Sequence, residues 1–345
     1  MKAYVYKEPY HIVQEERAIP EPGEGQVRVR VKAAAICGSD TNGFKGTSAM
    51  RKAPLVMGHE FSGIVDAVGA NVDPALTGAR VSANPAIPCG ECFNCKTGKF
   101  NVCDYRWNIG TTMKAGSWDG AFADYVIVPQ SNLIMLPDNV GFEEAALLEP
   151  AAVSLRAAKM MGDIAGKTVA VFGAGPIGLL AMQAARALGA DKILAIDMVD
   201  ARLALALSSG MADAVINTKQ DDPVTKVLEL TDGKGAYASL DAVGIKVSLN
   251  SCIALTRNSG TVAMVGMASE TIDGYTYKAC VTREMNLKGS YCYINEIQEA
   301  ADLLHQGKLN FKILITAVPM QQIQQKFEEL TGGHSKDIKV VLTNA

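Results

Sequence analysis

Four cysteines, Cys89, Cys92, Cys95 and Cys103, lie within one short segment of the chain. Thiolates this close together can complete a tetrahedron around one metal ion, and zinc is the metal most often held in this way. A shell of four cysteines leaves no open coordination position. We therefore expect this segment to hold a structural zinc ion, which stabilises a loop and takes no part in chemistry.

A glycine-rich motif lies between a predicted strand at 168–172 and a predicted helix at 176–188. In that context a G-x-G-x-x-G spacing predicts a dinucleotide-binding turn. The first glycine allows the turn, the second lets the backbone approach a pyrophosphate, and the third lets the helix pack closely on the strand. The N–H groups at the helix start would bind the phosphates. The predicted contacts are Gly173, Gly175, Pro176, Ile177 and Gly178.

Asp197 ends the next predicted strand. A carboxylate at this place accepts hydrogen bonds from the ribose hydroxyls of NAD and repels the 2′-phosphate of NADP, so NAD is favoured. Arg202 weakens that preference only slightly. Val243 and Val265, near the ends of two later predicted strands, complete the expected cofactor contacts. A glycine turn that binds no nucleotide is the alternative, and the combination of strand, helix and acidic residue speaks against it.

A second metal site, with an open position for chemistry, needs ligands from separate segments. Cys37 follows a predicted strand, and His59 precedes another. A lone histidine is more often structural than a ligand, and a lone cysteine is often a small buried residue. We expect such structural roles for the remaining residues of these types, His11, His305, His334, Cys252, Cys280 and Cys292.

The motifs of this chain resemble, in order and spacing over essentially its whole length, those of zinc-dependent medium-chain dehydrogenases. They are Cys37-Gly-Ser-Asp, Gly58-His59-Glu60, the four-cysteine segment, Leu148-Glu149-Pro150 and Gly173–Gly178. The chain is most similar to the polyol branch, which includes sorbitol, butanediol and galactitol-phosphate dehydrogenases, with threonine dehydrogenase nearby. Glu149-Pro150 is the polyol-type feature, because classical alcohol dehydrogenases have a second cysteine there.

The resemblance implies a catalytic zinc ion bound by Cys37 and His59. Glu60 and Glu149 contend for the remaining protein position, directly or through water, and the sequence does not decide between them. The zinc would lower the pKa of a substrate hydroxyl, Ser39 would pass the proton toward solvent, and the hydride would move to the nicotinamide. Ser39 could instead cap a local turn.

One departure from the family pattern follows the first motif. Many relatives have a histidine there that takes part in proton relay or substrate binding, whereas this chain has Thr41-Asn42. A relay through histidine is therefore not expected. The same departure makes threonine-type oxidation of an amino alcohol the less favoured alternative reaction.

Arg51 and Lys52 shortly precede His59, on a loop that in this family borders the substrate entrance. They could bind a phosphate, carboxylate or sulfonate group, although a solvated basic loop is the simpler interpretation. We expect the substrate to be a secondary alcohol of a polyol or sugar derivative, with or without an anionic group. A non-enzymatic nucleotide-binding protein of the same fold is disfavoured because Cys37, His59 and Glu149 are all retained.

The chain has 345 residues, enough for two domains. Its 48% hydrophobic and 20% charged residues are ordinary for a soluble protein. A net charge of -3 provides no basic surface for nucleic acid. The N-terminus lacks the apolar core of a signal peptide, and clustered cysteines suggest a reducing compartment, so we expect a cytoplasmic protein. The uncharged stretch at 168–185 is interrupted by glycines and is not expected to span a membrane.

The pattern of predicted elements divides the chain. Short strands with frequent glycine and proline turns dominate the first part. The pattern changes near Glu149-Pro150, and from there strands and helices alternate, as in a doubly wound parallel sheet. Together with the resemblance, this predicts an α/β protein with a GroES-like catalytic domain at 1–153 and 292–345 and a Rossmann domain at 154–291. The family is commonly dimeric or tetrameric, so a homo-oligomer is expected.

Overall fold

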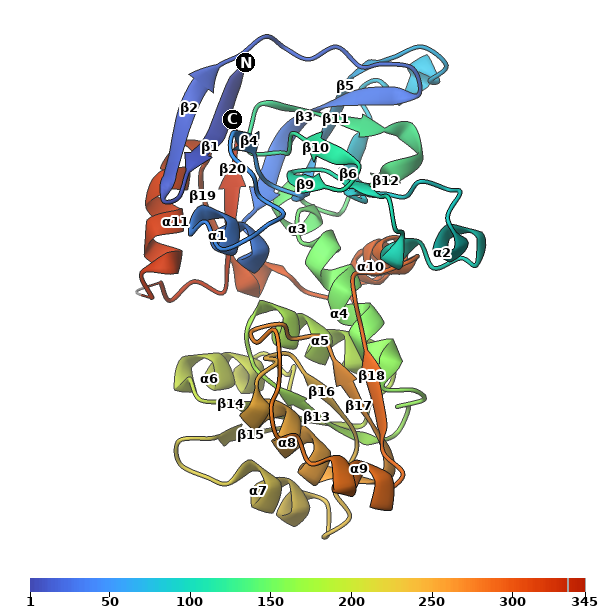
Figure 1. Cartoon of the computed structure of the whole chain (residues 1–345), viewed down its shortest axis with the longest axis vertical. Helices are drawn as coiled ribbons and strands as arrows, with labels where there is room; N and C mark the ends of the chain where they lie inside the picture. The colour runs from blue at the N-terminus through green and yellow to red at the C-terminus, as the bar shows by residue number, and fades with distance from the viewer. Residues whose placement is uncertain (334, 345) are drawn as a thin grey trace. The chain divides into compact units, whose positions relative to one another are not determined.

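A computed structural model of the protein describes residues 1–333 and 335–344 (Figure 1). The chain forms two compact units. The first contains Met1–Glu149, Ile297–His305 and the described residues from Asn310 onward, and the second contains Pro150–Glu296 and Gln306–Leu309. The chain thus begins in the first unit, builds the second and returns, so the first unit is assembled from segments far apart in the sequence.

The first unit is built around a seven-stranded sheet in the order β12-β6-β5-β3-β20-β19, with β11 also paired to β3. Val27, Val29 and Val31 of β3 are buried, which confirms the alternating pattern predicted for this segment. The strands are β3 (Gln26–Ala35), β5 (Glu60–Val68), β6 (Arg80–Ala83), β11 (Tyr125–Pro129), β12 (Leu133–Met135), β19 (Ile315–Pro319) and β20 (Lys339–Thr343).

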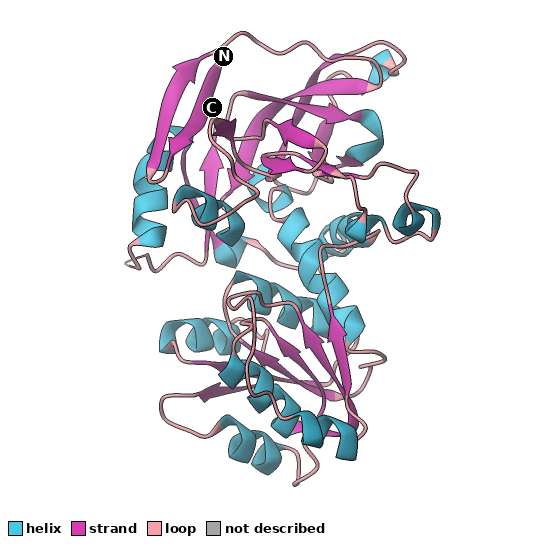
Figure 2. Ribbon diagram, in the orientation of Figure 1, coloured by secondary structure: helices cyan, strands magenta, loops and turns pink. Residues whose placement is uncertain are grey.

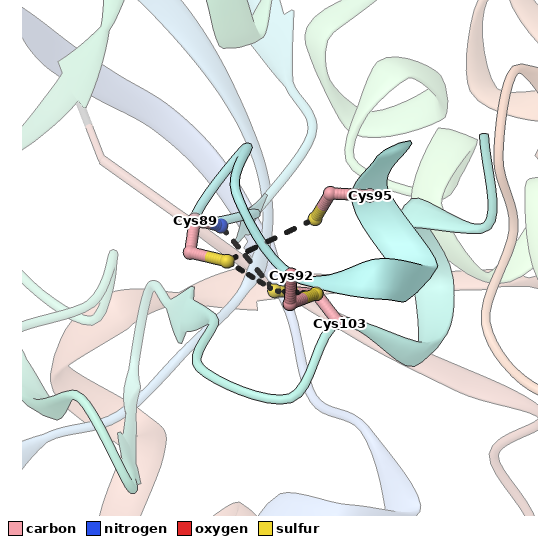
Figure 3. Close-up of side chains that lie close together, drawn as sticks. All are labelled: Cys89, Cys92, Cys95 and Cys103. Carbon is pink, nitrogen blue, oxygen red and sulfur yellow. Dashed lines mark hydrogen bonds between the residues drawn. The ribbon is translucent and has the colours of Figure 1, made fainter. Parts of the chain in front are cut away.

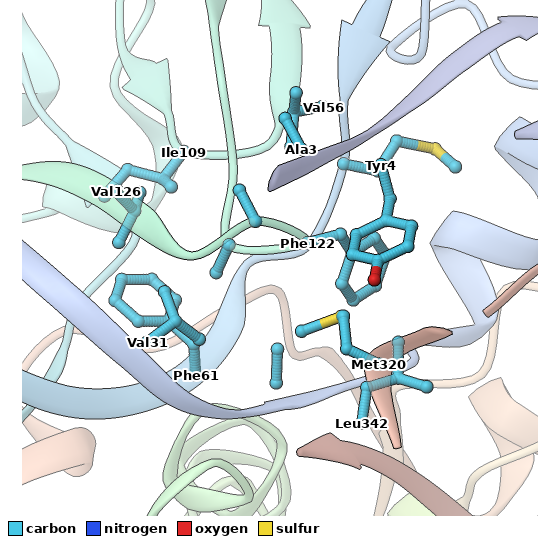
Figure 4. Packing of buried hydrophobic residues seen from close by; sticks show 14 of the residues in the cluster. Ala3, Tyr4, Val31, Val56, Phe61, Ile109, Phe122, Val126, Met320 and Leu342 are labelled. Carbon is cyan, nitrogen blue, oxygen red and sulfur yellow. The ribbon is translucent and has the colours of Figure 1, made fainter. Parts of the chain in front are cut away.

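Smaller sheets complete this β-rich unit. A three-stranded sheet has the order β2-β1-β4, and two further pairs are β10-β9 and β7-β8. These strands are β1 (Lys2–Glu8), β2 (His11–Glu16), β4 (Leu55–Val56), β7 (Ala86–Ile87), β8 (Trp107–Asn108), β9 (Thr111–Met113) and β10 (Gly116–Trp118). The core between the elements includes Phe61, Phe122, Met320 and Leu342, as Figure 4 shows.

The helices of the first unit are short. They are α1 (Gly38–Phe44), α2 (Phe93–Lys96), α3 (Phe142–Ala145), α10 (Glu296–His305) and α11 (Ile323–Thr331). Single 3₁₀ turns are η1 (Pro74–Leu76), η2 (Phe100–Val102), η3 (Gln130–Asn132), η4 (Lys312–Leu314) and η5 (Met320–Gln322). Helix α4 (Leu148–Met160) leads from the first unit into the second.

The second unit contains a six-stranded parallel sheet in the order β15-β14-β13-β16-β17-β18. Helices α5, α6 and α8 pack against its central strands (Figure 2). The strands are β13 (Thr168–Phe172), β14 (Lys192–Asp197), β15 (Ala214–Asn217), β16 (Ala236–Asp241), β17 (Thr256–Met264) and β18 (Asn286–Gly289). The helices are α5 (Pro176–Ala187), α6 (Asp200–Ser208), α7 (Pro223–Leu230), α8 (Lys246–Leu255) and α9 (Tyr277–Thr282).

Central parallel strands are covered by helices on both faces, so they are nearly continuous apolar runs. Val169, Ala170 and Val171 of β13 are fully buried, as this rule requires. The uncharged stretch at 168–185 is therefore a strand, a turn and the start of a helix. Within the described residues, every helix is too short or too polar to cross a membrane.

Candidate functional site

The four cysteines of the predicted structural site converge in the first unit (Figure 3). Cys92 precedes α2, Cys95 lies within it, and Cys103 follows η2. The Sγ atoms of Cys89 and Cys103 are 3.4 Å apart, those of Cys92 and Cys103 3.9 Å, and those of Cys89 and Cys95 4.0 Å. Tetrahedral zinc with bonds of about 2.3 Å separates its sulfur ligands by about 3.8 Å. The donor set and spacing therefore fit zinc.

The charge state of this cluster favours metal binding. Backbone N–H groups of Glu91 and Cys92 donate hydrogen bonds to Cys89 and lower the pKa of its thiol to about 7. A thiolate is the form that binds zinc, so a lowered pKa reduces the cost of deprotonation on metal binding.

A second group combines a thiol, an imidazole and a carboxylate. The candidate ligand atoms of Cys37, His59 and Glu60 all lie within 4.8 Å of one another. Antiparallel pairing of β3 and β5 sets Ala35 opposite Glu60. Cys37, which caps α1 just after β3, therefore lies close to His59, which directly precedes β5. Sulfur, nitrogen and carboxylate oxygen are the donors of a catalytic zinc site, so the residues present fit that metal.

Gly58 explains how the chain can place His59 here. Its φ is +97°, and a Cβ at this position would lie 2.7 Å from a ring carbon of Phe122. The backbone therefore needs glycine at this turn to keep both the left-handed conformation and the contact with the core. His59 is 7% exposed as a result, with one edge of its ring turned to Asp40.

Asp40 contacts two residues of this second group and is fully buried. Its Oδ1 is 3.4 Å from Nδ1 of His59, and its Oδ2 accepts a hydrogen bond of 3.2 Å from the backbone N–H of Cys37. Although burial opposes the charged form, His59 and Arg51 lower the pKa of Asp40. Burial likewise opposes the charged form of His59, while Asp40 and Cys37 raise the pKa of its ring.

The interpretation of Arg51 as a substrate-binding cation is wrong. The structure shows it buried, with a side chain 2% exposed. Its guanidinium is bonded to Asp40 at 2.9 Å and donates a hydrogen bond of 2.8 Å to Ser39 Oγ. A cation already paired inside the protein is not available to a substrate anion, since breaking the pair would leave Asp40 buried and unpaired. Lys52, the next residue, is exposed.

Lys339 forms a buried ion pair with Glu60, one of the two glutamates that are candidates for binding the metal. It heads β20, is buried, and donates a hydrogen bond of 2.8 Å to Oε1 of Glu60, with Oε2 at 2.6 Å. Burial opposes its charged form, and Glu60 raises the pKa of its ammonium group. At the second glutamate, Glu149 in α4, desolvation raises the pKa to about 7 despite the opposing charge of His59.

The nucleotide motif has the predicted strand–turn–helix geometry. Gly173 follows β13 with a φ of +101°, and α5 begins at Pro176. A Cβ on Gly178 would lie 1.7 Å from the carbonyl oxygen of Gly173, which leaves no alternative to glycine, whereas a Cβ on Gly175 would meet nothing within 4 Å. Ile177 is partly buried, and its carbonyl accepts a hydrogen bond of 3.1 Å from Ser154 Oγ.

Asp197 ends β14 and is joined to this turn. Its Oδ2 accepts a hydrogen bond of 2.6 Å from the N–H of Ala174, and Arg202 lies 4.0 Å away. Val243 also reaches the turn, because its Cγ2 would be 2.8 Å from a Cβ on Gly173. Val265, after β17, donates its N–H to the carbonyl of Asp241. The structure thus gathers the predicted cofactor residues around one end of the parallel sheet.

Replacing Gly178 with alanine is expected to weaken NAD binding at least tenfold, because the new methyl group would displace the turn that approaches the pyrophosphate. Titration of the protein with NADH, followed by nucleotide fluorescence, measures this loss. Gly289→Ala is the matched control, since a Cβ there meets nothing within 4 Å. Equal affinities of the Gly178 variant and the wild type would contradict the assignment of the turn.

Residues outside these groups have local roles. His11 lies 3.4 Å from Glu8, and His305 ends α10 beside Asn139, 2.6 Å away. His334 lies outside the described residues. Cys252 is fully buried, and Cys280 and Cys292 are half-buried. Sequence reasoning missed Asp40 and Lys339 as parts of the site. The available signals were Asp40 within the quoted motif and a charged residue at the head of an apolar strand.

The chain matches two family models, the alcohol dehydrogenase GroES-like domain over residues 23–138 and the zinc-binding dehydrogenase over residues 176–306. It is 32% identical over 347 residues to sorbitol dehydrogenase of Bacillus subtilis (strain 168), covering 99% of this chain and 97% of that protein. Galactitol-1-phosphate dehydrogenase from Escherichia coli superimposes with a TM-score of 0.92 at 29% identity, covering 100% of both chains.

A third comparison concerns the cofactor. The structure of a short chain alcohol dehydrogenase from E. coli complexed with NADH has a TM-score of 0.92 and 30% identity, covering 100% of this chain and 99% of that one. The chain therefore belongs to the zinc-binding dehydrogenase family with an alcohol dehydrogenase GroES-like domain. It is an oxidoreductase that uses zinc and a nicotinamide cofactor, and the predicted fold class and the resemblance to polyol dehydrogenases are confirmed.

Proposed function

We propose that this protein oxidises a secondary alcohol of a polyol or sugar derivative, phosphorylated or not, with zinc and NAD. The observation that carries the proposal is the convergence of Cys37, His59 and Glu60 within 4.8 Å. It stands in a chain whose full-length relatives include a sorbitol dehydrogenase and a galactitol-1-phosphate dehydrogenase. A structural or purely nucleotide-binding protein would have no need for this open set of ligands.

A zinc ion held by this group supplies a Lewis acid that makes a substrate hydroxyl more acidic, and NAD supplies the hydride acceptor. The side chains of the protein orient the zinc ligands and transfer the substrate proton toward solvent. Asp40 faces Nδ1 of His59, which leaves Nε2 for the metal and sets the ring orientation. Ser39 lies in the first turn of α1, is only half-buried, and offers its hydroxyl for passing the proton toward solvent.

The ion pair formed by Lys339 affects which of the two glutamates, Glu60 or Glu149, can bind zinc directly. Its ammonium group pairs with both oxygens of Glu60, so direct zinc ligation by Glu60 would have to compete with a buried cation. We propose that either Glu60, whose carboxylate already lies with Cys37 and His59, or Glu149 completes the zinc shell directly, and that the other carboxylate acts through water.

The proposal of NAD over NADP rests on Asp197. Its carboxylate is 7% exposed at the end of β14, beside the turn that would hold the pyrophosphate. A 2′-phosphate would meet this negative charge at short range. Arg202 lies 4.0 Å from the same carboxylate, so its charge is partly compensated by Asp197 and offers only a weak site for a phosphate.

We also propose a homo-oligomer, a dimer or a tetramer, in the cytoplasm. Strand β18 is at the edge of the parallel sheet, and the neighbouring α9 exposes 65% of Tyr277 and 57% of Val281. An unpaired edge beside exposed apolar side chains favours association with a second copy. Four of the cysteines converge as candidate ligands of one metal ion, which supports a reducing compartment.

The proposed activity is tested by NAD⁺ reduction across a panel of polyols, polyol phosphates and threonine, after the zinc content has been measured. We expect two zinc ions per chain, NADH formation with at least one polyol or polyol phosphate, and a slower reaction with NADP⁺. Strong preference for phosphates would favour a role for Lys52, which remains exposed. Activity with threonine alone, or with no compound of the panel, would contradict the proposal.

A further inference from the structure

Arg51 joins two parts of the candidate active site through one guanidinium group. Its Nη2 donates hydrogen bonds to Ser39 Oγ at 2.8 Å and to Asp40 Oδ1 at 2.9 Å, and its Nε donates to the same Oδ1 at 3.2 Å. Asp40 in turn accepts from the backbone of Cys37 and faces the ring of His59. Arg51 therefore contacts the proposed proton-transfer hydroxyl. It reaches Cys37 through Asp40, and it reaches His59 both through Asp40 and directly, with Nη2 3.4 Å from Nδ1.

The fold provides a specific place for this side chain. A Cβ at Gly43 in α1 would lie 2.3 Å from Cγ and 2.7 Å from Cβ of Arg51, so the stem of the arginine fills the room that the missing side chain leaves. The guanidinium is thereby directed at the first turn of α1, where Ser39 and Asp40 lie. If Arg51 lay on a solvated basic loop, the chain would need neither the glycine at position 43 nor the fully buried carboxylate of Asp40.

We propose that Arg51 is a positioning residue of the reaction, which holds Ser39 Oγ and, through Asp40, the ring of His59 in their working orientations. The proposal rests on the proposed function, in which Ser39 transfers the substrate proton and His59 binds zinc. In this role Arg51 contacts protein groups and not the substrate.

The chemistry of the guanidinium suits this role. It has donors only and keeps its protons in proteins, so it occupies one lone pair of Ser39 Oγ and cannot itself receive the substrate proton. The O–H and the second lone pair of Ser39 stay available for the transfer. The fixed positive charge also stabilises negative charge that develops on this oxygen as its proton leaves. Without this donor the hydroxyl would sample other staggered rotamers.

The test uses Arg51→Lys, which keeps a positive charge beside Asp40 but loses the planar fork that reaches two acceptors at once. Removing the support of a metal ligand or reacting group of this kind typically costs about 10–100-fold. We therefore expect kcat to fall at least tenfold with KM changed less than threefold, and zinc to be lost faster to a chelator. In a Ser39→Ala background the same substitution should lower kcat by a clearly smaller factor than in the wild type, because one of its two targets is already missing, whereas the faster loss of zinc should persist.

Arg28→Lys is the matched control. Arg28 also pairs with a carboxylate in the first unit, Asp66 at 2.7 Å, but its partners lie outside the site. It should keep the activity and zinc retention of the wild type. If Arg51→Lys does not fold, the double variant Asp40→Asn/Arg51→Gln, which removes both buried charges and retains hydrogen-bonding groups, takes its place in the same measurements.

Equal losses of kcat with and without Ser39 would overturn the proposal, as would zinc retention identical to the wild type. The zinc measurement needs no substrate, so it separates this inference from the proposed function. An enzyme that is silent on the substrate panel but loses zinc faster in the Arg51 variant would refute the polyol activity and still support the link from Arg51 to His59. Silence together with unchanged zinc retention would overturn both.

Discussion

Replacing His59 with glutamine is expected to remove one of the two zinc ions per chain and to lower kcat about a thousandfold or more. His59 is one of three residues whose ligand atoms lie within 4.8 Å of one another, and the amide of glutamine is a poor substitute for imidazole at zinc. A Lewis acid contributes several kcal/mol to such a reaction, and about 4 kcal/mol corresponds to a thousandfold in rate.

Zinc analysis by mass spectrometry and steady-state kinetics measure the two effects on the same sample. The control is His305→Gln, because His305 lies beside Asn139 at the end of α10 and takes no part in either metal group. It should retain two zinc ions and full activity. A His59 variant that keeps both zinc ions would show that the imidazole is structural, and the proposed catalytic centre would have to be abandoned.

Replacing Lys339 with methionine is expected to lower the free energy of unfolding of the first unit by about 3–5 kcal/mol, the usual cost of breaking one buried ion pair. Glu60 is 0% exposed, and the side chain of Lys339 is 5% exposed. Removing the ammonium group leaves a buried carboxylate without its ion-pair partner. The loss should exceed that of any exposed ion pair, for which about 0–1 kcal/mol is typical.

Denaturation followed by tryptophan fluorescence suits this measurement, because both tryptophans of the chain, Trp107 and Trp118, lie in the first unit. The double variant Lys339→Met/Glu60→Gln is the control, since it removes both charges. It should recover most of the lost stability, as neutral replacements of buried pairs commonly do. If the double variant is as unstable as the single one, packing around the methionine, rather than the unpaired charge, accounts for the loss.

Most of the features that could be predicted from the sequence are encoded in local motifs. The dinucleotide turn is encoded within a few consecutive residues, because glycine is needed where φ is positive, as at Gly173, and where backbones touch, as at Gly178. The four-cysteine cluster is similarly local, since its ligands span only positions 89–103. The alternation of strands and helices after Glu149 predicted the parallel sheet, because helix-covered strands are apolar on both faces.

The candidate active site is different, because its ligands and their support come from separate segments. The sequence indicated Cys37, His59 and the two glutamates through the family resemblance, but neither spacing nor composition showed what lies behind them. Lys339 meets Glu60 across 279 residues of chain because β20 and β5 both pair with β3. A contact between residues so far apart in the sequence cannot be predicted from a local sequence pattern.

Arg51 shows the same limit most clearly. Its neighbours in sequence suggested a solvated basic loop, and only the packing of its stem against Gly43 carries the guanidinium inward to Asp40. The sequence alone was enough to predict the fold class, the nucleotide turn and the candidate metal-binding side chains. The tertiary structure decided which charges are buried and which partners neutralise them, because burial and pairing depend on segments that only the folded chain brings together.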